Sequence, residues 1–152
     1  MGVKSAIVAT AAVLFAMVIL APISIRAQLE FRTLFCQFSV GSSARFYTEW
    51  DANAVKDKLD FTFDGIDTSQ AKARVVGPFG MTNVLLFRGN NSLNFLEIMT
   101  DGNQAFTTVF FSHHREGKQR GAAIWYPAVH SRHMMIGRSP VISHYRGYCQ
   151  PS

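Results

Sequence analysis

The sequence predicts an all-β domain, an antiparallel meander of eight or nine strands that closes fully or partly into a barrel, preceded by an N-terminal signal helix. Hydrophobic and polar residues alternate in most segments, as they do in strands with one buried side. The connectors are short and rich in Gly and Asn, as in tight hairpins. Two cysteines lie near the two ends of the exported chain, where a bond would join the first and last strands. A β-sandwich is the alternative, since the same strands can also stack as two sheets.

The N-terminus has the layout of a secretory signal peptide. Lys4 precedes an apolar run from residue 6 to 21, and residues 22–27 follow, with Ala27 as the small residue of a possible cleavage site. We expect cleavage after Ala27, which makes residues 1–27 the signal peptide and 28–152 a single β domain. The alternative is an uncleaved anchor in the inner membrane, because residues 6–25 are just long enough to span a bilayer. Both interpretations export the β domain, to the periplasm or out of the cell.

Nine segments of the β domain have strand-like patterns. In the clearest one, "LDFTF", Leu59, Phe61 and Phe63 face one way and the polar residues between them face the other. The predicted strands span residues 34–40, 44–50, 59–63, 73–77, 83–88, 93–100, 105–111, 122–131 and 140–149. Turns are expected at 77–81, 88–92, 101–104 and 137–140, with a longer loop at 115–121. Residues 51–58 are the one segment that could form a helical turn, with Asp51 as its cap.

Cys36 and Cys149 are the two cysteines of the chain. An oxidising compartment favours a disulfide between them, and two free buried thiols are the alternative. Such a bond closes a loop of more than a hundred residues, for which chain entropy gives roughly 4–5 kcal/mol of stabilisation.

Positive charge is concentrated in the last quarter of the chain. Without Lys4 and Arg26, 13 basic and 10 acidic residues remain, a net charge of +3. Residues 112–152 contain six basic residues, one acidic residue and all five histidines. The field of such a block attracts anionic partners, although a solvated cationic face has the same composition.

The candidate binding residues lie on the last two predicted strands. His144, Arg146 and Tyr148 share one face of the final strand, and we expect His130 and Arg132 to join that face when the strands pair. Aromatic rings between Arg and His suit an anionic glycan, lipid or protein surface. We do not expect a nucleic-acid partner or a cofactor. The outer face of a barrel, with Arg stems over Tyr rings, is the structural alternative.

Motifs for chemistry are weak. No G-x-S-x-G elbow and no glycine-rich phosphate loop occur, so no catalytic residue is predicted. A zinc site needs three or four convergent ligands, and the odd spacing of His130 and His133 places them on opposite faces of a strand. A hydrolase or metal enzyme that uses His130, His133 or His144 is therefore a secondary hypothesis.

Three motifs carry a resemblance: an early cysteine strand, a "GN…TTVF" hairpin and an "SRH…P…SxYxGxC" ending. These are Cys36, then Gly102-Asn103 with Thr107 to Phe110, and then Ser131-Arg132-His133, Pro140, Ser143, Tyr145, Gly147 and Cys149. Through these three motifs, residues 34–150 resemble a family of small, uncharacterised exported bacterial proteins. The resemblance implies export and a disulfide. The expected shape also resembles calycin-type barrels, which hold small apolar ligands, although the lipocalin G-x-W signature is missing.

The sequence therefore predicts an exported, non-enzymatic binding protein. Its ligand is expected to be either a small apolar molecule in the barrel or an anionic partner on the basic C-terminal strands. The other alternative is a cell-envelope interaction protein held in the membrane by residues 6–25, the one case in which we expect a membrane contact.

Overall fold

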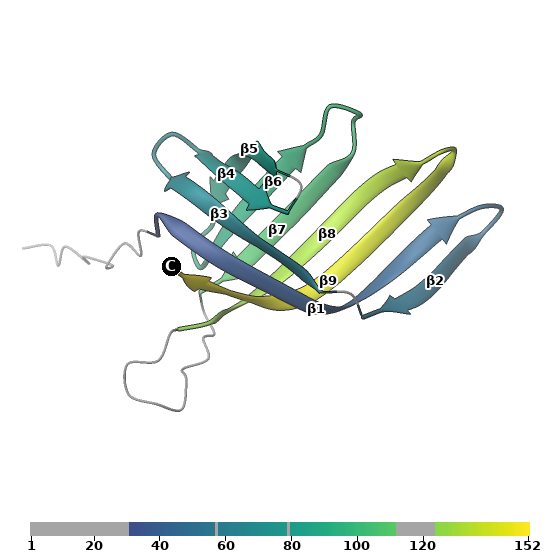
Figure 1. The fold of residues 1–152 in the computed structure, drawn as a ribbon, viewed down its shortest axis with the longest axis horizontal. Coiled ribbons are helices and arrows are strands. Elements are labelled where there is room, and N and C mark those ends of the chain that lie inside the picture. The colour runs from purple at the N-terminus through teal and green to yellow at the C-terminus, as the bar shows by residue number, and fades with distance from the viewer. Residues whose placement is uncertain (1–30, 57, 79, 112–123) are drawn as a thin grey trace, which may run out of the picture.

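The fold is a closed antiparallel β-barrel, seen in a computed structural model that describes residues 31–56, 58–78, 80–111 and 124–152 (Figure 1). The described residues form one sheet of nine strands. Its strands are β1 (Thr33–Phe46), β2 (Trp50–Val55), β3 (Leu59–Asp67), β4 (Lys72–Gly77), β5 (Gly80–Arg88), β6 (Ser92–Ile98), β7 (Gln104–Phe110), β8 (Tyr126–Ile136) and β9 (Ser139–Pro151). The all-β prediction is confirmed, and the barrel holds rather than the sandwich.

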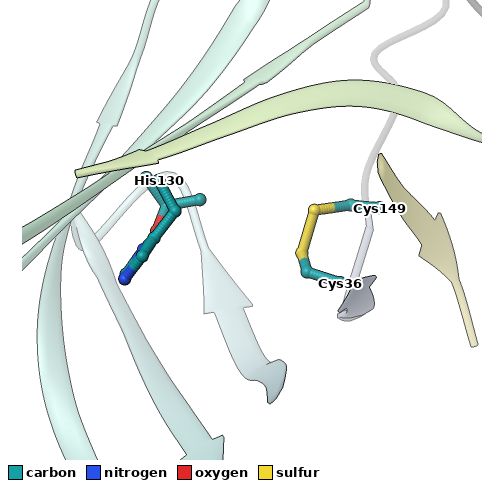
Figure 2. The surroundings of a disulfide bond; sticks show 4 residues. Cys36, His130 and Cys149 are labelled. Atoms are coloured by element: carbon teal, nitrogen blue, oxygen red, sulfur yellow. A yellow bond between two sulfur atoms is a disulfide. The ribbon is translucent and has the colours of Figure 1, made fainter. Parts of the chain in front are cut away.

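The strand order in the sheet is β2-β1-β3-β4-β5-β6-β7-β8-β9. An additional pairing between β1 and β9 closes β1 and β3 to β9 into a ring. The two strands pair from Leu34 opposite Pro151 to Arg45 opposite Val141. Cys36 and Cys149 face each other in this register, with their Cα atoms 4.0 Å apart, and they form the predicted disulfide (Figure 2). Both cysteines are fully buried. The disulfide therefore crosses the seam of the barrel from inside.

The β1–β2 region differs from the sequence prediction. The sequence predicts separate strands at 34–40 and 44–50, but β1 is continuous through a β-bulge between Phe38 and Val40 and ends at Phe46. The predicted helical turn at 51–58 is wrong, because β2 pairs with the second half of β1 as a hairpin that extends beyond the barrel (Figure 1). A single turn is too short to be stable alone, whereas an adjacent strand edge satisfies its backbone groups.

The barrel interior is filled at one end only. At the end that contains the disulfide, the inward side chains are tightly packed; they include Leu34, Leu86, Leu93 and Val109. Phe31, Phe111 and Tyr126 pack their rings together there, with centroids 5.2 to 5.4 Å apart. Toward the other end, smaller and polar side chains face inward, and the packing gives way to a cavity.

Several predictions lie outside the described residues: the signal peptide at 1–27, its alternative as an anchor at 6–25, and the loop at 115–121. In the described ranges, no helix is long and apolar enough to cross a membrane.

Candidate functional site: a cavity in the barrel

A cavity of about 410 Å³ occupies the open half of the barrel. Its walls come from β3 to β8, and its aromatic floor is made of Phe61, Phe63 and Phe95. The rings of Phe63 and Phe95 stack with their centroids 3.7 Å apart and nearly parallel. Cavities of this size are at the lower end of the range that holds drug-sized ligands, roughly 300–1,000 Å³.

His130 is buried in the wall of the cavity, with 4% of its surface exposed. Its Nδ1 lies 2.8 Å from the Thr107 hydroxyl oxygen, and its ring packs against Phe38 and Phe61. Burial lowers the pKa of His130 to about 3, with a further contribution from the positive charge of Arg132. The imidazole is therefore neutral at physiological pH.

Arg132 is the next inward residue of β8. Its Nε donates to His130 Nε2 at 3.2 Å, and its guanidinium carbon lies 5.8 Å from the centre of the Tyr145 ring. Because Nε can only donate, Nε2 of His130 must be the acceptor, and the imidazole proton is on Nδ1, which donates to Thr107. This chain of contacts holds the guanidinium in a defined position in the wall.

No described residue forms an ion pair with Arg132. Across the described part of the chain, no carboxylate lies within 4.0 Å of it, and the single ion pair there, Arg74 with Asp64, is on the outer surface. Glu97 also lines the cavity, at the same level, because Ala105 pairs with both Glu97 and Arg132 in the sheet register. The two charges thus face the same space without contact.

The five predicted binding residues divide between the two sides of the barrel wall. The register pairs His130 with Tyr145 and Ser131 with His144, so His130 and Arg132 point inward. His144, Arg146 and Tyr148 point outward. The expectation of one shared face is therefore wrong. It required His130 to pair with His144 or Arg146, and the actual register of β8 and β9 differs from that by one residue.

On the outer side, His144 Nδ1 lies 2.7 Å from the Ser131 hydroxyl. Arg146 and Tyr148 line a groove of about 760 Å³ together with Trp125 and Phe110. His133 lies beside His144, with ring centroids 6.5 Å apart. His130 faces the other way, and the described residues contain no group of three His, Cys, Asp or Glu side chains that could bind a metal ion.

Several inward-facing residues around the cavity are absent from the set predicted from the sequence. Thr107 and Glu97, which line the cavity, and Tyr145, which is buried on β9, belong to alternating patterns whose inward side the sequence left unassigned. For β9, the position of Cys149 indicates which side of the strand faces inward. A cysteine in a cross-barrel disulfide faces inward, so Tyr145 and Ser143 face inward too.

Comparison of the chain with family models, with curated proteins and with solved structures found no match.

Proposed function

We propose that the protein is an exported, non-enzymatic binding protein that holds a small apolar ligand inside its barrel. The observation that carries the proposal is the half-filled interior, in which an aromatic floor opens into a cavity of about 410 Å³. Apolar walls with a few placed polar groups are typical of sites for small molecules. Thr107, His130 and Arg132 are such groups.

Location is part of the same proposal. A disulfide is consistent with an oxidising compartment, and Cys36 and Cys149 form one. Together with the signal-peptide pattern of residues 1–27, it supports a periplasmic or secreted protein.

The test is titration with a neutral hydrophobic fluorophore, compared across three chains. The wild type is expected to bind about one equivalent saturably. Ala105→Phe places a ring inside the cavity between Glu97 and Arg132, where it takes the space of the ligand, and is expected to abolish binding. Gln104→Phe adds the same ring on the outer side of the same strand and serves as the matched control. Equal binding by both variants, or no saturable binding by the wild type, would contradict the proposal.

A second candidate is an anionic glycan on the outer groove, favoured by the placement of Arg146 beside Trp125 and Tyr148. Rings next to a guanidinium suit such a ligand. Arg146→Ser is expected to weaken binding of an acidic oligosaccharide without any effect on the fluorophore. An unchanged affinity for the oligosaccharide rejects this candidate.

A further inference from the structure

We propose that the ligand of the barrel is an apolar monocarboxylic acid, whose carboxylate pairs with Arg132 and whose tail lies on the floor of Phe61, Phe63 and Phe95. This inference rests on the proposed function and specifies the chemical class of its ligand. It combines a fixed cation in the cavity wall with the apolar surface below it.

The guanidinium of Arg132 is fixed in position and has donors that an anion can accept from. Its Nε is used by His130 and one face of its guanidinium is near Tyr145, while both Nη groups lack a hydrogen-bond partner among the described residues. A half-buried cation without a counter-charge is costly, and a carboxylate would relieve that cost. The Nη groups offer donors in the geometry that a carboxylate accepts.

The surroundings strengthen this interaction. His130 is neutral, so it supports Arg132 as a hydrogen-bond acceptor and does not compete for the anion. The cavity surface that β3, β5 and β6 provide is mostly apolar and includes Phe61, Phe63, Val84 and Phe95. An ionic hydrogen bond is worth more in such walls than in water.

Two acidic residues border the cavity, and one of them restricts the ligand. The alternation of β3 directs Asp60 outward, toward the outer groove that it also borders. Glu97 faces the cavity at the level of Arg132, so a second carboxylate on the ligand would be repelled. A single acid group on an apolar tail therefore pairs with Arg132 and brings no second negative charge toward Glu97.

Competition with the fluorophore tests the inference, with decanoate and decanol as probes of equal tail length at pH 7. The wild type is expected to bind decanoate at least about tenfold more tightly than decanol, the effect of one charged hydrogen-bonded pair. Arg132→Met is expected to remove that preference and leave decanol affinity nearly unchanged. Glu97→Gln removes the opposite charge at the same level and is expected to retain or increase decanoate affinity.

The outcomes separate the two proposals. If the fluorophore does not bind the wild type, and so cannot be displaced by either probe, the proposed function fails together with the inference. Equal wild-type affinities for decanoate and decanol overturn the inference alone, as does a preference for the acid that survives in Arg132→Met. The wild-type comparison decides even if Arg132→Met does not fold, which its near-ultraviolet circular dichroism will reveal.

Discussion

His130 and Thr107 form a buried hydrogen bond between neighbouring strands of the barrel, with Nδ1 and the hydroxyl oxygen 2.8 Å apart. The bond uses the neutral imidazole, and no acidic side chain among the described residues stabilises the charged form. The causes of the lowered pKa of His130 are burial and then the positive charge of Arg132. Protonation of this histidine is therefore coupled to unfolding of the barrel.

The first prediction is that stability falls as the pH drops from about 6.5 toward 3. His130 has a pKa of about 3 in the folded protein, against 6.5 for an ordinary histidine. In that window the unfolded chain binds a proton that the folded chain does not, so the slope approaches about 1.4 kcal/mol per pH unit. Above pH 6.5 the imidazole is neutral in both states, so the contribution of His130 to the free energy of unfolding is fully present. Urea unfolding between pH 7 and 4 measures it.

A double variant isolates the histidine. His130→Phe with Thr107→Val keeps the ring and the volumes but removes the titrating group, and is expected to flatten the slope. The pKa values of Asp64 and Asp67 are lowered from 3.8, by hydrogen bonds from the Gly65 backbone and from Ser69 respectively, so those carboxylates affect stability mainly below the measured range of pH 7 to 4. His133→Phe on the outer face is the control. A slope that persists in the double variant contradicts the assignment.

The barrel could be predicted from sequence because alternation and short turns are local signals, and because one disulfide linked the two ends of the chain. Val129 shows where that information stops. It alternates with Ala128 and His130, and both sets of β8 residues contain apolar side chains, so the inward set depends on the register with β9. The Arg132–His130 contact then follows from the register and from side-chain rotamers, which alternation does not encode.

The second prediction concerns the seam between β1 and β9. The Cys36–Cys149 bond spans 113 residues, and chain entropy assigns it about 4–5 kcal/mol. Cys36→Ala with Cys149→Ala is expected to lose that amount in urea unfolding. Reductant is expected to destabilise the wild type similarly and to leave the double variant unaffected. A loss below about 1 kcal/mol would mean that strand pairing alone holds the seam.

The third prediction concerns Gly147, which faces the bulged part of β1. A Cβ atom there would lie 1.9 Å from the carbonyl oxygen of Gln37 and 2.7 Å from the Cα of Phe38. These are backbone atoms of the closing strand, so Gly147→Ala is expected to cost more than about 2 kcal/mol. Gly77→Ala is the matched control, because its Cβ meets Phe61 at 3.8 Å, an ordinary contact. That variant is expected to match the wild type or gain up to about 1 kcal/mol. Equal thermal unfolding of the two variants would exclude a tight seam.

The last prediction follows the tail of the ligand to the cavity floor. Phe95→Leu removes part of a ring that stacks on Phe63, and is expected to cost about 1–2 kcal/mol of stability while it deepens the cavity. Affinity in a series of straight-chain acids should therefore peak at a longer chain than in the wild type. Phe106→Leu makes the same change on the outer side of β7, where the ring is 41% exposed, and should leave the optimum unchanged. If the optimum stays fixed in a folded Phe95→Leu variant, the tail does not reach the floor. The acid would then bind at the rim through Arg132 alone, and its affinity should depend on ionic strength more than on chain length.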